Sequence, residues 1–364
     1  MLTGGELPRH GVYGLHDILP TDQRLLGSHL GELGYRTCLV GKQHVSGHWA
    51  EAAGRHPHDG WDEYHWCPAA FAFNEVPHNA YARWLEERSP EWSRRLAREG
   101  NRIGPLPEEL HNARWTADRT IEFLEGEAGK SAPFFCMTSF FDPHDPYDLA
   151  PANWLEPDAE VPPPLPRPQG RTPSPVERER EGGYLGPHAS FSEEEILAIR
   201  RGYRASVRFL DHQVGRVLDA SERAGKAEDT LVIFTSDHGD QLGDHDLMVK
   251  GAFFYEPSVR VPLVLRWPGK TRAGTICPAL VQLNDLAATC LEAAGAGDTN
   301  RSARMPDSRS LMPLVSGESG LRHRDFVICP YRDSGVRRGS RGSLPWDPPI
   351  HATMIRDERW KLCV

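Results

Sequence analysis

Residues 230–239 read Thr230-Leu231-Val232-Ile233-Phe234-Thr235-Ser236-Asp237-His238-Gly239, and this stretch decides the fold. Its short apolar run, from Leu231 to Phe234, is bounded by polar residues, which predicts a strand buried on both faces. Asp237 and His238 follow directly at the carboxyl end of that strand, where ligands of open α/β sheets bind. Because Asp237 offers a hard oxygen and His238 a nitrogen, the pair predicts a site for a divalent cation.

More ionisable residues follow within a few positions, namely Asp244, His245 and Lys250. Gly239 and Gly243 would let the backbone turn closely around a bound group. The alternative interpretation is a polar loop in which Asp237 caps a helix. A cap needs neither His nor Lys, so the density of ionisable groups favours a functional site.

A second predicted strand ends in residues of the same kind. Residues 34–44 read Gly34-Tyr35-Arg36-Thr37-Cys38-Leu39-Val40-Gly41-Lys42-Gln43-His44. Lys42 can hold a tetrahedral oxyanion as a compact point charge, and His44 points to the same side in an extended chain. A lone Lys or His after a strand is usually a solvated loop residue. Two such clusters at equivalent strand ends favour one shared site.

A third apolar run begins at Phe134 and ends in a histidine, His144, which stands between Pro143 and Pro146. Each proline fixes its own φ and restricts the residue before it, so we expect His144 to lie in a stiff, extended loop. The alternative is that this segment is only a turn, which its Asp and Pro content also allows.

Taken together, these segments resemble the type I sulfatases of the alkaline phosphatase superfamily. That family carries a strand ending in Ser-Asp-His-Gly or Ser-Asp-Asn-Gly, followed by Gly-Asp-His, Lys-Gly and Arg-Val-Pro-Leu. The matching segments here are Ser236–Gly239, Gly243–His245, Lys250-Gly251 and Arg260–Leu263. The family's Gly-Lys-Trp-His is Gly41-Lys42-Gln43-His44 in this chain, and Gln43 should point away from the site. The resemblance spans residues 2 to about 361.

The resemblance implies a sulfuric ester hydrolase with a Ca²⁺ site, or a site for another divalent cation such as Mn²⁺ or Mg²⁺, that uses Asp237 and His238. Lys42 and Lys250 would hold the oxygens of a small anionic sulfate ester. His44 would act as the base on a hydrated formylglycine, releasing sulfate, and the family's segment places His144 near the leaving alcohol.

Two other interpretations stay open. A phosphonate or phosphate ester hydrolase of the same superfamily could use these residues, since both anions are tetrahedral. In the second interpretation, the chain is a non-catalytic remnant or an anion-binding pseudoenzyme.

The nucleophile of this family is a formylglycine made from the Cys of a Cys-x-Pro-x-Arg motif. None of the seven cysteines stands in that motif, although Cys67 and Cys329 each precede a proline. Residues 1–12 resemble the segment that usually follows it, so we expect a chain that is truncated before its first strand and two acidic metal ligands. We also expect it to be clipped near residue 364. Such a chain would be inactive, and the absent strand would leave the Cys38 and Leu231 strands unpaired.

The alternation of short apolar strands with helical patterns, such as residues 115–124 and 203–218, predicts an α/β fold. We expect an alkaline-phosphatase-like, mixed but mostly parallel sheet sandwiched by helices. Residues 1–301 would form the catalytic domain, and residues 302–364 a small, incomplete antiparallel subdomain. The Pro- and charge-rich residues 156–186 predict an extended excursion, which either walls the site or is a solvated loop. Residues 337–342 predict a similar loop that could approach an anionic substrate.

Composition excludes some functions. The formal net charge of −9, without a basic stripe, argues against binding of nucleic acid. No apolar stretch approaches the ~20 residues that a membrane span needs. The odd number of cysteines, without framework spacing, indicates reduced core residues and favours a cytoplasmic setting, although a signal peptide could not be assessed from this chain. No pattern indicates the oligomeric state or the alcohol portion of the substrate.

Overall fold

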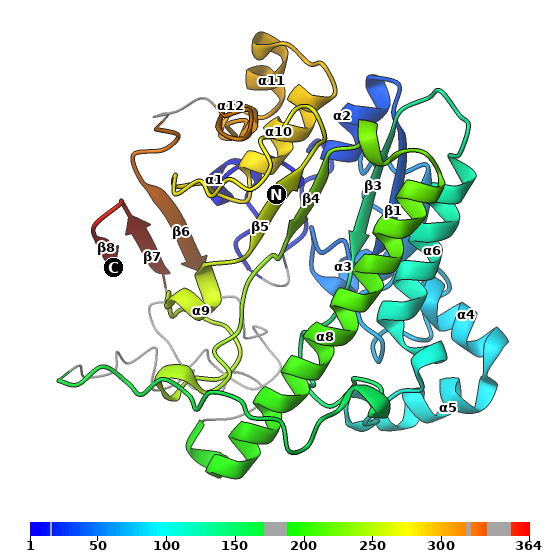
Figure 1. Ribbon diagram of the computed structural model, residues 1–364, viewed down its shortest axis with the longest axis vertical. Coiled ribbons are helices and arrows are strands. Elements are labelled where there is room, and N and C mark those ends of the chain that lie inside the picture. The colour runs from blue at the N-terminus through cyan, green and yellow to red at the C-terminus, as the bar shows by residue number, and fades with distance from the viewer. Residues whose placement is uncertain (15–16, 171–187, 318–321, 333–350) are drawn as a thin grey trace.

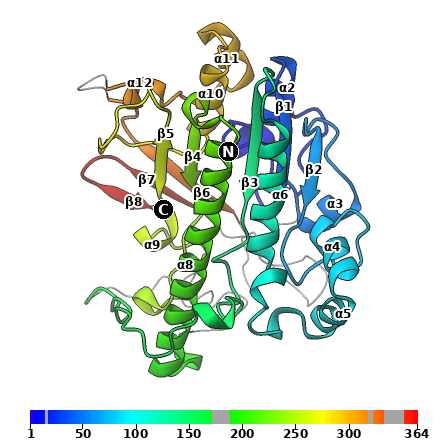
Figure 2. The ribbon, with the colours of Figure 1, turned by 45° about the vertical axis from the view of Figure 1, so that its right-hand side comes forward.

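The computed structural model describes residues 1–14, 17–170, 188–317, 322–332 and 351–364. Short strands form the centre, helices cover both of their faces, and a small antiparallel sheet lies to one side (Figures 1 and 2). The end of the 156–186 excursion and the whole 337–342 loop fall outside the described residues. Among the described helices, none has the length and apolar character needed to cross a membrane.

The central strands form two groups. In the first group, β1 (Arg36–Gly41) pairs in parallel with β2 (Glu63–Trp66) on one side and with β3 (Phe134–Ser139) on the other. In the second, β4 (Val232–Thr235) pairs antiparallel with β5 (Leu263–Arg266). The C-terminal sheet has the order β6-β7-β8 and is formed by Val327–Arg332, His351–Arg356 and Lys361–Cys363.

The longer helices are α2 (Leu26–Glu32), α4 (Ala80–Arg88), α5 (Pro90–Glu99), α6 (Asn112–Gly126), α8 (Glu193–Arg223), α10 (Asp285–Ala293) and α11 (Asp298–Arg304). The shorter ones are α1 (Leu7–His10), α3 (His48–Ala53), α9 (Glu256–Val259) and α12 (Met312–Val315). The predicted helical segments 115–124 and 203–218 lie inside α6 and α8. A capping box of Ser192 and Glu195 begins α8.

Strand β1 shows how the two faces are filled. Side chains alternate along a strand, so Cys38 and Val40 enter one core while Leu39 enters another. The first core contains side chains from α4, α5 and α6, and the second contains leucines of α2 together with Ala287 and Leu291 of α10. Burial of β1 on both faces, with helices against each, confirms the helix-sandwiched α/β class.

Two predictions about the strands were wrong, and the predicted domain boundary lies within a helix. The Cys38 strand has a partner on each side, so the expectation that it borders an unpaired gap was wrong. The expectation that the Leu231–Phe234 strand is buried on both faces was also wrong, because Phe234 of β4 is 40% exposed. The proposed domain boundary between residues 301 and 302 falls inside α11, and the first antiparallel C-terminal strand begins only at Val327.

The strand edges of β3 and β4 that lack a ladder partner within the described residues predict limited stability of the folded chain. The two strands lie side by side in both views, yet within the described residues each has a ladder partner on one side only (Figures 1 and 2). Free edges and half-exposed apolar side chains favour aggregation. We expect the 364-residue chain to aggregate or to melt below ~60 °C, the upper range of ordinary domains.

Val264 offers a test of this expectation, because it lies opposite Phe234 and is 58% exposed. The variant Val264→Lys should increase the soluble fraction in light scattering, whereas Val364→Lys at the exposed C-terminus should not. A cooperative melt above ~60 °C without scattering would contradict the prediction.

His29 on α2 predicts loss of stability in acid. His29 is buried, and Nδ1 of its ring lies 2.8 Å from Nη1 of Arg304 on α11. Burial, together with the charges of Arg304 and Arg24, lowers the pKa of His29 to about 4. Because the unfolded chain binds this proton near pH 6.5 and the folded chain does not, stability is present above pH 6.5 and is lost as pH falls towards 4. The loss should reach about 2 kcal/mol at pH 4.5.

The variant His29→Gln should flatten this pH dependence in urea melts at pH 7 and pH 4.5. The exposed His58→Gln should behave like the unchanged protein. Equal slopes for all three proteins would contradict a role for His29.

Candidate active site

The carboxyl ends of β1, β3 and β4 meet in one place. Lys42 follows β1, and its backbone N–H donates to the carbonyl of Ser139 at the end of β3. Adjoining strand ends therefore carry the predicted residues towards each other. The charge of Asp237, which follows β4, acts on both Lys42 and His44. The ring of His144, which follows β3, lies 5.9 Å from the ring of His238.

His144 and Lys250 form the closest contact in this cluster. Nζ of Lys250 lies 2.5 Å from Nε2 of His144, and Nδ1 of the same ring lies 3.0 Å from Oδ1 of Asp145. Since the ammonium donates, Nε2 must accept, and the ring proton is then on Nδ1 and is held by Asp145. Burial lowers the pKa of Lys250, against the opposing charges of Asp145, Asp240 and Asp237. One proton therefore lies in the hydrogen bond between Lys250 and His144.

The loop around His144 differs from the predicted one. It turns sharply, with the backbone N–H of His144 donating to the carbonyl of Phe141 over 3.1 Å, and so is not extended. Both Asp-Pro bonds in it, Asp142-Pro143 and Asp145-Pro146, are cis. The turn brings Asp145 as well as His144 towards Lys250, which lies 3.9 Å from Oδ1 of Asp145.

The loop after β1 is held by a buried glutamate of α3. Oε1 of Glu51 accepts from the backbone N–H groups of Val45 and Ser46. His44 has a positive φ of 54°, and its ring lies 4.4 Å from the ring of His48. Burial, followed by the charges of Lys42 and His48, lowers the pKa of His44. His44 is nevertheless exposed, so solvent moderates the lowering, and the imidazole is neutral at pH 7.

Asp237 and His238 form the remaining part of the cluster. Burial alone would raise the pKa of Asp237, but the charges of His238 and Lys42 hold it below its ordinary value. Burial lowers the pKa of His238 against the pull of Asp237, so its imidazole is available as a neutral ligand. Oδ2 of Asp237 and Nε2 of His238 lie 3.8 Å apart. One carboxylate and one imidazole fit part of a divalent-cation site. Within the described residues, no third Cys, His or acidic side chain is grouped with them.

The structure thus brings together all six residues singled out from the sequence, namely Lys42, His44, His144, Asp237, His238 and Lys250. Gln43 is buried, in keeping with a side chain that points away from the site. His245 lies apart, with its ring 4.2 Å from that of Tyr255. Part of the 156–186 excursion lies against the segment that contains His245, because the backbone N–H of Leu165 donates to Asp244.

Three neighbours of the cluster were missed from the sequence, namely Glu51, His48 and Asp145. Asp145 had a usable signal, since it directly follows His144. Glu51 and His48 had none, because only the folded path of the loop after β1 places them beside His44.

This fold and this cluster define a class of protein, the alkaline-phosphatase-like hydrolases. The assignment is narrower still, because a sequence model of the sulfatase family matches residues 1–296, and the chain belongs to that family.

The chain is similar to two curated proteins over nearly its whole length. A multifunctional alkaline phosphatase superfamily protein of Trinickia caryophylli is 29% identical, with 100% of this chain and 73% of that protein covered. An arylsulfatase of Clostridium perfringens is also 29% identical, with 99% of this chain and 80% of that protein covered.

Solved structures agree on the fold. A phosphonate monoester hydrolase of Silicibacter pomeroyi aligns with a TM-score of 0.77 at 22% identity, covering 100% of this chain and 76% of that one. A protein in complex with D-glucosamine-2-N,6-O-disulfate aligns with a TM-score of 0.69 at 18% identity, with 100% and 77% covered. At these identities the likeness shows the fold alone.

Proposed function

We propose that this protein cleaves a sulfate monoester at the six clustered residues. The observation that carries the proposal is the approach of two lysines, Lys42 and Lys250, to Asp237 and three imidazoles at adjoining strand ends. Lysine ammonium groups suit the oxygens of a tetrahedral anion, and membership of the sulfatase family supports sulfate as that anion.

Each residue has a role that follows from its surroundings. Lys42 and Lys250 hold oxygens of the transferred group as negative charge builds on them. His44, whose pKa is lowered, accepts a proton as a general base. The proton shared by Lys250 and His144 is available to the departing alcohol oxygen, and Asp145 keeps the ring of His144 in the required tautomer.

Asp237 and His238 would hold a divalent cation, which would neutralise an oxygen of the substrate. Further oxygen ligands must complete the coordination, and Ca²⁺, Mn²⁺ and Mg²⁺ all accept a carboxylate. A formylglycine does not fit any cysteine of this chain, since none stands in Cys-x-Pro-x-Arg. The roles above are therefore limited to binding and proton movement.

The test uses protein that contains this chain together with a Cys-x-Pro-x-Arg nucleophile motif. We expect 4-nitrophenyl sulfate to be hydrolysed faster than 4-nitrophenyl phenylphosphonate, and Asp237→Asn to abolish both activities. His58→Ala, in an exposed loop, is the matched control. A preference for the phosphonate would support the alternative, a phosphonate ester hydrolase with the same cluster.

A further inference from the structure

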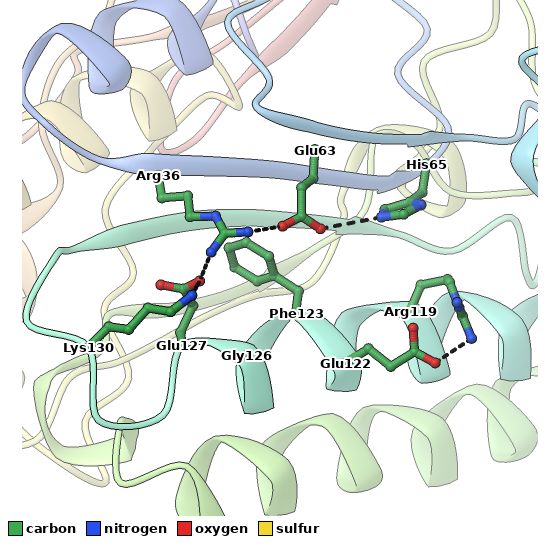
Figure 3. A pocket seen from close by; sticks show the side chains of 9 residues that line it. All are labelled: Arg36, Glu63, His65, Arg119, Glu122, Phe123, Gly126, Glu127 and Lys130. Carbon is green, nitrogen blue, oxygen red and sulfur yellow. Dashed lines mark hydrogen bonds and ion pairs between the residues drawn. The ribbon is translucent and has the colours of Figure 1, made fainter.

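A second cluster of ligand-type side chains lies apart from the active site, on the face of the sheet that α6 covers. It consists of Cys38 on β1 with Glu63 and His65 on β2. Glu63 and His65 line a pocket of about 250 Å³ between β2 and α6 (Figure 3). Cys38 is fully buried in the core beside them. None of these three side chains takes part in the roles assigned above.

The register of the sheet explains why they converge. Cys38 pairs with Glu63, and Val40 pairs with His65, in parallel ladders. Paired residues of parallel strands point to the same face, and residues two apart on one strand do so as well. One ligand atom from each of Cys38, Glu63 and His65 therefore lies within 4.8 Å of the other two.

These spacings are close to those of a bound transition metal. Oε2 of Glu63 lies 3.5 Å from Nε2 of His65. Tetrahedral bonds of about 2.0–2.3 Å to zinc place ligand atoms roughly 3.3–3.6 Å apart. The Cys38 sulfur lies within 4.8 Å of both of these atoms, so a small side-chain shift would bring all three to bonding distance of one ion.

The surroundings orient the carboxylate and leave room for another ligand. Arg36 pairs with Oε1 of Glu63 and with Glu127 of α6, so Oε2 remains directed at His65 (Figure 3). Outer partners of this kind fix a metal-binding carboxylate. The side chains of Glu63 and His65 are each 32% exposed, so an ion can enter from the pocket.

We propose that Cys38, Glu63 and His65 bind a borderline transition metal ion, of which Zn²⁺ is the best match, with a fourth position open to the pocket. Thiolate, imidazole and carboxylate are the ligands that Zn²⁺ prefers, and three protein ligands with an open position is a known zinc geometry. Binding converts the Cys38 thiol to a thiolate, forms the metal–sulfur bond and releases one proton to solvent. Because the thiol must lose its proton to bind, affinity should rise with pH.

Cobalt(II) titration tests the site, because a thiolate bound to cobalt gives a charge-transfer absorption band. The exposed thiols are first removed by Cys277→Ser and Cys363→Ser. In this background we expect the band to saturate at one Co²⁺ per chain, with Zn²⁺ displacing it and about one proton released per ion. Cys38→Ser should abolish the band, and His65→Ala or Glu63→Gln should weaken binding at least ~10-fold.

Two controls keep the outcome decisive. Cys67→Ser removes another buried thiol of the same core, and Asp237→Asn alters the proposed active site; both should leave the band unchanged. His65→Ala tests the site even if Cys38→Ser fails to fold, because His65 lies at the pocket surface. Absence of the band at stoichiometric Co²⁺, or a band that survives Cys38→Ser, would overturn the proposal and leave Glu63 and His65 as an ordinary ion pair.

Discussion

The 364-residue chain is expected to bind an aryl sulfate without hydrolysing it. Binding should occur because the proposed site places Lys42 and Lys250 beside neighbouring imidazoles, and ammonium groups suit the oxygens of a tetrahedral anion. Hydrolysis should not occur, because covalent catalysis by this family needs a nucleophile that Lys and His cannot replace. The expected rate is below ~10⁻³ s⁻¹, against the ~1–10³ s⁻¹ of ordinary enzymes.

Three of the less exposed cysteines do not offer a substitute nucleophile. Cys67 is fully buried, and burial raises its pKa to about 12. Burial also raises the pKa of Cys290 to about 12 and that of Cys329 to about 11. A thiol with so high a pKa is almost wholly protonated at pH 7 and is a poor nucleophile.

Two measurements separate binding from turnover. Calorimetry should detect inorganic sulfate bound by the unchanged chain, and Lys42→Ala should weaken this binding while Lys270→Ala, at an exposed turn, should not. Release of 4-nitrophenol from 4-nitrophenyl sulfate should stay at the level of the His44→Ala variant. Turnover that His44→Ala abolishes would contradict the prediction and would require a nucleophile elsewhere in the chain.

The fold and the six clustered residues could be predicted because the relevant signals are local. A short apolar run identifies each strand, and the polar residues after it occupy the carboxyl end, where adjoining strands converge. Lys42, His44, Asp237 and His238 were found in this way. His144 was found despite a wrong expectation for its loop, since the place of a residue after a strand does not depend on how the loop turns.

The errors and omissions concern pairing between distant segments. An apolar run reports that a strand forms but not which strands lie beside it, so the sequence did not reveal that β1 has partners on both sides. The same limit applies to exposure. Phe234 lies in an apolar run that is typical of a buried strand, and its side chain is nevertheless 40% exposed. The Cys38, Glu63 and His65 cluster was missed for this reason too, since only the β1–β2 register brings residues 38 and 63 together.

In protein that contains this chain together with a Cys-x-Pro-x-Arg nucleophile motif, Lys42→Ala should lower kcat for aryl sulfate hydrolysis by about 10²–10³-fold, as expected when one donor to a developing oxyanion is removed. Lys42 stands directly after Gly41, whose φ of 101° and close approach to the carbonyl of Ser139 leave no room for a Cβ. The lysine therefore leaves the strand along a fixed path. Its ammonium group is partly desolvated, which lowers its pKa, and it lies in the field of Asp237, Glu51 and Asp145.

The variant Lys42→Arg separates charge from geometry. Arginine keeps the positive charge, but its planar fork does not match the position of a compact ammonium group, so we expect only partial recovery of kcat. Lys270→Ala serves as the control, because its side chain is exposed. The measurement is kcat and KM for 4-nitrophenyl sulfate with all four proteins. If Lys42→Ala kept kcat within about threefold of the unchanged enzyme, well short of one lost oxyanion donor, Lys42 would not contact the transferred group in the transition state.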